Sequence, residues 1–137
     1  GTPFTPRDAI FGELTYHDYY DPRRCIRTAR HKLIVNFSAA PAFMDPSQSW
    51  RPRTTTRVPP EPALAYHPPI ELYDLAADPN EWHNLADAPD HNTTRRDLLA
   101  RLGAWMRDTG DPLLDGAVTS PMHRRAVVAL EDAVGGA

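Results

Sequence analysis

The chain has 137 residues and a formal net charge of −3, which gives room for one modest domain and provides no concentrated basic surface for nucleic acid. No apolar run approaches the length of a membrane span, so we expect neither nucleic acid nor a membrane as a partner. Cys25 is the single cysteine, which excludes an internal disulfide and a metal site built from cysteines.

The N-terminal part of the chain has the alternating pattern of short strands. β-branched and aromatic residues are enriched there, and proline marks a turn between the first two strands. We expect strands at residues 8–17, 24–28 and 31–37, with a turn at residues 18–22.

Side chains alternate between the two faces of a strand, which divides the residues of the first strand into two sets. Glu13 and His17 share one face with Phe11, whereas Ile10 and Leu14 share the other. We expect the face with Ile10 and Leu14 to be the core side, so that Glu13 and His17 look outward together.

A proline-rich segment separates these strands from the second half of the chain. Residues 39–69 contain eight prolines between Pro41 and Pro69, which predicts a long surface loop with an extended backbone. A fourth strand is expected at residues 70–75, followed by a turn at residues 77–81 and a helical turn at residues 81–86 that seats Trp82 and Leu85.

Two helices are predicted after these elements. Leucines, Trp105 and Met106 recur at helical spacing over residues 94–109, and Gly110 provides a stop. Ser120 followed by Pro121 is a typical start for a last helix that extends to about Ala133.

These elements indicate the α+β class: about four antiparallel strands covered by a long C-terminal amphipathic helix, with a short tail helix. We expect one domain over residues 8–112, which includes the loop at residues 39–69, and a tail over residues 113–137.

No catalytic machinery is recognisable from the residues alone. The six histidines are scattered, the serines lack the context of an activated nucleophile, and no spacing typical of a metal site occurs. We therefore predict no catalytic residue and no metal ligand in this chain, which leaves a small independent hydrolase as the weakest reading.

Three segments nevertheless resemble the C-terminal subdomain of sulfatases. The first is Phe11–His17, and the second runs from Pro22 to Phe37 and contains the stretch Ile-Arg-Thr-Ala-Arg-His-Lys-Leu-Ile. The third is Glu71–Leu75, followed by Asp78-Pro79 and a leucine-rich helix. The end of that helix, Trp105–Pro112, is similar to the corresponding segment of bacterial sulfatases of the heparan N-sulfatase (sulfamidase) branch.

The resemblance implies that this chain is part of a larger hydrolase. Sulfatases use a formylglycine, made from the cysteine of a Cys-x-Pro-x-Arg motif, and a calcium ion, both in the N-terminal catalytic domain. Cys25 lacks that motif, so no cofactor is expected in this chain, and the chain alone is expected to be inactive. The implied partners are the N-terminal sulfatase catalytic domain and, for the whole enzyme, a sulfated saccharide or an aryl sulfate.

Four residues are candidates for the rim of the substrate cleft: Glu13, His17, Arg23 and Arg24. An arginine fork suits the geometry of sulfate or carboxylate. Two alternatives stay open: these residues brace the interface with the catalytic domain, or the chain is a stand-alone binding or scaffold domain. A fragment would also expose apolar surface, which promotes self-association.

Overall fold

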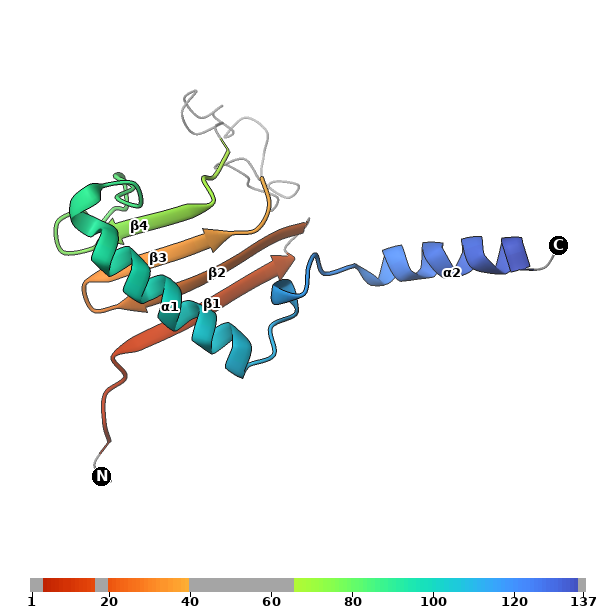
Figure 1. The fold of residues 1–137 in the computed structure, drawn as a ribbon, viewed down its shortest axis with the longest axis horizontal. Helices are drawn as coiled ribbons and strands as arrows, with labels where there is room; N and C mark the ends of the chain where they lie inside the picture. The colour runs from red at the N-terminus through yellow and green to blue at the C-terminus, as the bar shows by residue number, and fades with distance from the viewer. Residues whose placement is uncertain (1–3, 17–19, 40–65, 136–137) are drawn as a thin grey trace, which may run out of the picture. The chain divides into compact units, whose positions relative to one another are not determined.

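The computed structural model describes residues 4–16, 20–39 and 66–135. It contains a four-stranded sheet, one long helix and one terminal helix, which confirms the α+β class (Figure 1). Two compact units are distinguished, residues 1–105 and residues 106–137. Within the described ranges neither α-helix has the length and apolar character that a bilayer span requires.

The sheet of the first unit is antiparallel throughout and follows chain order, β1-β2-β3-β4. Its strands are β1 (Ala9–Tyr16), β2 (Tyr20–Thr28), β3 (His31–Asn36) and β4 (Ile70–Asp74). One end of the sheet, where β1 and β3 end and β2 and β4 begin, is called the polar end below. Most of the loop predicted at residues 39–69 lies outside the described residues.

Helix α1 (Asn92–Asp108) confirms the long predicted helix, and up to Trp105 it lies across one face of the sheet (Figure 1). The 3-10 turn η4 (Pro89–His91) leads into it. The core of this unit consists of buried apolar side chains from the sheet, from α1 and from the segment before it. They are Ile26, Leu33, Leu72, Ala86, Leu98 and Leu102.

The core face of β1 was predicted wrongly. The ring of Phe11 stacks on Trp105 of α1, with ring centroids 5.0 Å apart and planes 4° apart, so the Phe11 face is covered. Ile10, on the other face, is 55% exposed. Both faces of this strand carry apolar residues, and the aromatic contact with α1 decides which one is inside.

The predicted turn at residues 18–22 is wrong from residue 20 onward, because β2 already begins at Tyr20. The register of β1 against β2 shifts there: Leu14 faces Arg23, but Tyr16 faces Tyr20. Two residues of β2, Asp21 and Pro22, thus stand opposite one residue of β1, which is a β-bulge. Proline has no N–H to donate, and a bulge is one of the few places where a paired strand tolerates it.

The helical turn predicted at residues 81–86 does not form. Trp82 is 77% exposed, and Glu81 has a φ of 59°. The chain instead runs along the outer edge of β4, where the Asn84 side chain accepts from the Leu72 N–H and donates to the Ile70 carbonyl, over 2.9 and 3.1 Å. These bonds cover the edge of the sheet that the loop would otherwise leave open.

The second unit contains the end of α1, the 3-10 turn η5 (Pro112–Leu114) and helix α2 (Pro121–Gly135). Gly110 has a φ of 65°, and its N–H donates to Arg107 while the N–H of Asp111 donates to Met106. This is the Schellman arrangement, which confirms Gly110 as the stop of α1. Helix α2 confirms the predicted tail helix, and the Ser120 hydroxyl accepts from the His123 N–H at its start.

Candidate functional site at the polar end of the sheet

The sequence-predicted candidates divide between the two faces of the sheet. Glu13 and Arg24 are cross-strand partners on the face that α1 covers, whereas Arg23 projects from the opposite, open face. His17 lies outside the described residues. The structure therefore brings Glu13 and Arg24 together and separates both from Arg23.

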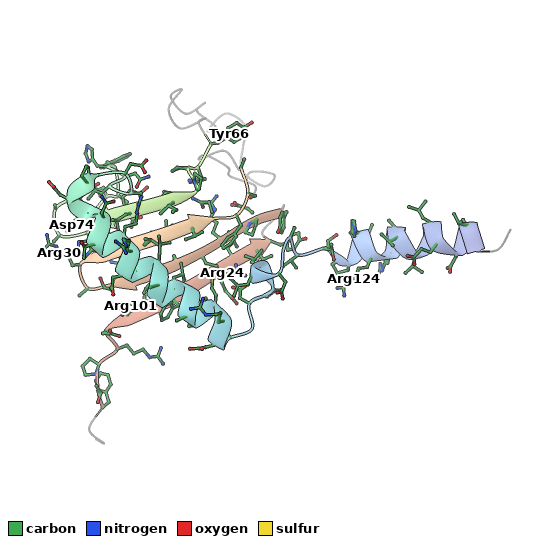
Figure 2. The ribbon with its side chains drawn as sticks, viewed as in Figure 1. Arg24, Arg30, Tyr66, Asp74, Arg101 and Arg124 are labelled. Atoms are coloured by element: carbon green, nitrogen blue, oxygen red, sulfur yellow. The ribbon has the colours of Figure 1, made fainter. Side chains whose placement is uncertain are left out.

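Arg24, labelled in Figure 2, is buried, with 2% of its surface exposed, and its guanidinium is bound by the protein itself. Nη1 donates to the carbonyl oxygens of Leu14 and Arg23 at 2.7 and 2.9 Å, and Nη2 donates to the Thr15 hydroxyl at 3.2 Å. The Glu13 carboxylate lies 3.9 Å from Nε, but its side chain is 66% exposed. Arg24 thus ties the end of β1 to β2 beside the bulge.

Arg23 is held by a buried carboxylate on the same strand. Its Nε and Nη2 donate to the two oxygens of Asp21 at 3.0 and 2.5 Å, in the two-pronged geometry that arginine and carboxylate favour. The Arg23 side chain is 25% exposed, and Nη1 takes no part in this pair. Among the described candidates, this is the arginine with a positioned and partly accessible guanidinium.

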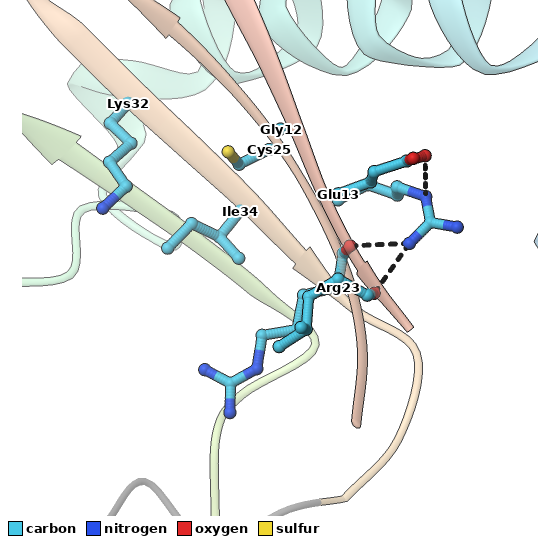
Figure 3. Close-up of a pocket in the computed structure, with 8 residues that line it drawn as sticks. Gly12, Glu13, Arg23, Cys25, Lys32 and Ile34 are labelled. Carbon is cyan, nitrogen blue, oxygen red and sulfur yellow. Dashed lines mark hydrogen bonds and ion pairs between the residues drawn. The ribbon is translucent and has the colours of Figure 1, made fainter. Parts of the chain in front are cut away.

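A shallow pocket of about 280 Å³ lies on the open face of the sheet (Figure 3). Its lining residues come from β1, β2 and β3: Gly12, Glu13, Leu14, Arg23, Arg24, Cys25, Lys32 and Ile34. Gly12 gives it depth, because a Cβ at that position would come within 3.0 Å of the Cys25 sulfur. The Lys32 ammonium is paired with Glu81 at 2.6 Å and Arg23 is paired with Asp21, so these two basic groups of the lining each have a carboxylate partner.

A second polar group, which sequence reasoning missed, lies beside Arg23 at the polar end. Asn36 is the cross-strand partner of Arg23, and its amide nitrogen donates to Glu71 at 2.7 Å. The buried Glu71 carboxylate also accepts from the Tyr73 hydroxyl at 2.5 Å and lies 3.0 Å from Nδ1 of His67. Burial, and then the bond to Glu71, raise the pKa of Tyr73 well above its ordinary value.

The described residues do not fit the cofactors that the resemblance implies. In residues 4–16, 20–39 and 66–135, no group of three or more His, Cys, Asp or Glu side chains is arranged to hold a metal ion. Cys25 is a free thiol inside β2, facing Gly12. The described residues therefore provide no site for the calcium ion, and Cys25 is no precursor of a formylglycine.

Comparison with known proteins connects this fold to sulfatases. The chain is 33% identical over 104 residues to an ulvan-active sulfatase of Formosa agariphila, covering 74% of this chain. It is also 25% identical over 107 residues to an uncharacterized protein of Haemophilus influenzae, covering 78% of this chain. The chain spans 20% and 40% of the lengths of these two relatives. No family model matches it.

Two solved structures share the fold. A 2-O GAG sulfatase superposes with a TM-score of 0.52 at 19% identity, over 81% of this chain and 18% of that protein. A candidate sulfatase from Bacteroides thetaiotaomicron superposes with a TM-score of 0.54 at 18% identity, over 88% of this chain and 21% of that protein. The four-stranded sheet with its long helix is therefore an arrangement found within larger sulfatase chains.

Proposed function

Because the chain is homologous to one part of a sulfatase and has a fold found in others, we propose that it serves as the C-terminal subdomain of a sulfuric ester or sulfamate hydrolase. The observation that carries this proposal is the 33% identity over 104 residues to the ulvan-active sulfatase. The formylglycine and calcium that act on the sulfate group belong, in this proposal, to an N-terminal catalytic domain. The substrate class that follows is a sulfated saccharide, with aryl sulfates as simpler substitutes.

The subdomain packs on that catalytic domain through the open face of its sheet. This face carries Ile10, which is 55% exposed, together with Leu14 and Ile34, whereas α1 covers the other face. An uncovered sheet face with apolar residues is typical of a surface that is buried in a larger assembly. In the isolated chain the same surface promotes self-association, which Ile10→Glu is expected to reduce in sedimentation velocity.

The polar end of the sheet lies at the rim of the substrate cleft. Arg23 is the residue that contacts an anionic group of the substrate, because Asp21 orients its guanidinium and the side chain stays partly exposed. Arg24 braces this end from the covered face. Glu13 and His17 are proposed to reach toward the sugar.

The test of the overall proposal compares the full gene product with this 137-residue chain. Intact mass establishes the length of the natural protein, and hydrolysis of a chromogenic aryl sulfate measures its activity. We expect hydrolysis by the longer protein and none by this chain. If no longer product exists and this chain is stable and monomeric alone, the stand-alone binding domain replaces the sulfatase subdomain.

The rim residues are tested in the full-length enzyme on a sulfated oligosaccharide. Arg23→Lys keeps the charge but loses the fork, so KM should rise while the melting temperature changes little. Arg27→Lys is the matched control, because Arg27 lies on the same face of β2 and is exposed. His17→Ala should raise KM or lower kcat, and unchanged kinetics for both Arg23→Lys and His17→Ala would remove these residues from the rim.

A further inference from the structure

A pocket of about 360 Å³ at the polar end contains none of the four residues proposed for the rim of the substrate cleft. It lies where β3 ends and where the chain enters β4. Its lining consists of two short segments that are distant in sequence: Asn36, Phe37, Ser38, Ala39, His67 and Pro69.

Three of these residues carry a buried polar atom without a hydrogen-bond partner: Oδ1 of Asn36, Oγ of Ser38 and Nε2 of His67. In the part of the chain that the structure describes, one other buried side-chain atom, Nε of Arg95, is in the same state. Buried polar groups in folded proteins are nearly always paired, and an unpaired one is costly. Three of them around one pocket indicate partners that a bound molecule supplies.

The bonds on the far side of Asn36 fix what it offers to the pocket. Its Nδ2 donates to the Pro68 carbonyl and to the Glu71 carboxylate, both at 2.7 Å. The reversed amide would place Oδ1 against these two acceptors, so the orientation is determined chemically. Oδ1 is therefore a fixed acceptor.

His67 is fixed in the same way. Its Nδ1 lies 3.0 Å from Oε1 of Glu71, and a carboxylate can only accept, so Nδ1 carries the hydrogen. In the neutral ring, Nε2 is then an acceptor. The Tyr73 hydroxyl holds the other carboxylate oxygen, which keeps Glu71, and with it the ring, in place.

With the His67 ring neutral, the pocket thus presents two acceptors, Asn36 and His67, and the Ser38 hydroxyl, which both donates and accepts. An anion does not suit this set, because Glu71 stands directly behind it and two of the three groups have no hydrogen to give. The Phe37 side chain, 39% exposed, adds an apolar surface to the lining. A molecule with adjacent O–H donors on an otherwise apolar ring matches both features.

We infer that this pocket, called the diol pocket, binds a neutral saccharide, with two adjacent hydroxyls donating to Asn36 and His67 and a third contact to Ser38. The inference does not depend on the proposed sulfatase function, because it requires no catalytic domain. It also differs from the Arg23 rim site, which takes an anionic group.

The test is an NMR titration of the 137-residue chain with N-acetylglucosamine, observing the ring nitrogens of His67 and the backbone amide of Ser38. We expect saturable shifts at both positions. Tetrahydropyran, which has the ring without the hydroxyls, and sodium sulfate should give no saturable shift there. A pocket filled only by ordered water would leave both signals unmoved by the sugar, and that result would overturn the inference.

Variants separate binding from folding. Ser38→Ala removes an oxygen that has no partner, so the fold is retained, and the Kd should rise about 2- to 10-fold, the value of one hydrogen bond. His67→Ala should also raise the Kd, because it removes one of the two proposed acceptors. His83→Ala is its matched control, since His83 pairs with Asp78 at 3.4 Å but is exposed and outside the pocket. Binding that is insensitive to Ser38→Ala, or equal binding of tetrahydropyran, contradicts hydroxyl recognition. These outcomes are independent of whether the full gene product hydrolyses an aryl sulfate.

Discussion

Replacement of Arg24 by methionine tests whether this buried arginine is a brace or a ligand-binding residue. Methionine preserves most of the side-chain length and apolar contact but removes every hydrogen bond of the guanidinium. The bonds lost include those to the Leu14 carbonyl at 2.7 Å, the Arg23 carbonyl at 2.9 Å and the Thr15 hydroxyl at 3.2 Å. If the brace holds β1 to β2 beside the bulge, its loss destabilises the sheet.

The expected cost follows from these contacts. A hydrogen bond from a charged donor contributes about 1.5–3 kcal/mol, and a buried acceptor left without a donor costs about 1–3 kcal/mol. Part of this cost is offset because burying methionine does not require the desolvation of a charge. In addition, the side chain of Glu13 is 66% exposed, so the substitution does not leave a buried carboxylate without a partner. We therefore expect Arg24→Met to lower the free energy of unfolding by about 3 kcal/mol.

Urea unfolding of the 137-residue chain, followed by circular dichroism, measures this loss. With a slope of about 1.5 kcal/mol per molar urea for a domain of this size, the midpoint should fall by about 2 M. Arg27→Met is the control, because Arg27 is an exposed arginine in the same strand and should change stability by less than about 0.5 kcal/mol. Equal midpoints for Arg24→Met and Arg27→Met would show that Arg24 does not stabilise the sheet. Arg24 would then again be a candidate for binding a ligand.

Three further measurements test the fold. The Arg30 guanidinium, followed by backbone N–H groups, holds the pKa of Asp74 at about 2, below its ordinary 3.8. The contribution of Asp74 is therefore complete above about pH 4 and is lost as pH falls through about 2. In acid unfolding, the free energy of unfolding of Asp74→Asn should change less with pH in this range than that of the wild type. Phe11→Ala should cost about 2 kcal/mol in urea unfolding, with altered Trp105 fluorescence, because the stacked ring is lost. Gly110→Ala should lower the melting temperature, because alanine at a φ of 65° adds about 1 kcal/mol of backbone strain. A Cβ at this position has no other atom within 4 Å, so no steric clash adds to that strain.

Much of the fold could be predicted from periodicity alone. Leu33 is buried in β3, on the opposite face from Lys32 and Ile34 as the alternation of the strand predicts, and Leu98 and Leu102 form the buried stripe of α1. Local patterns failed where both faces of an element carry apolar residues. In β1 the choice between Phe11 and Ile10 depends on which side Trp105 approaches, and this contact joins residues 94 positions apart in the sequence.

The candidate site was less accessible to sequence reasoning, because it depends on register. Alternation does place Arg23 and Arg24 on opposite faces, but it cannot reveal that Asp21 holds one and backbone carbonyls hold the other. The contact of Asn36 with Glu71 spans 35 positions and requires β3 and β4 to pair in one particular register. The domain boundaries expected at residues 8–112 and 113–137 stay a prediction.

The distribution of buried charge indicates where function constrains this sheet. The described part of the first unit buries four charged side chains, and three of them, Asp21, Arg24 and Glu71, lie toward the polar end. Burying paired charges contributes little stability compared with apolar residues of similar size, so stability alone does not explain this concentration. Each of the three instead fixes a neighbour: Asp21 orients Arg23, Arg24 closes the bulge, and Glu71 sets the donor and acceptor roles of the diol pocket. The concentration of this cost at one end supports the proposed recognition surface at the polar end.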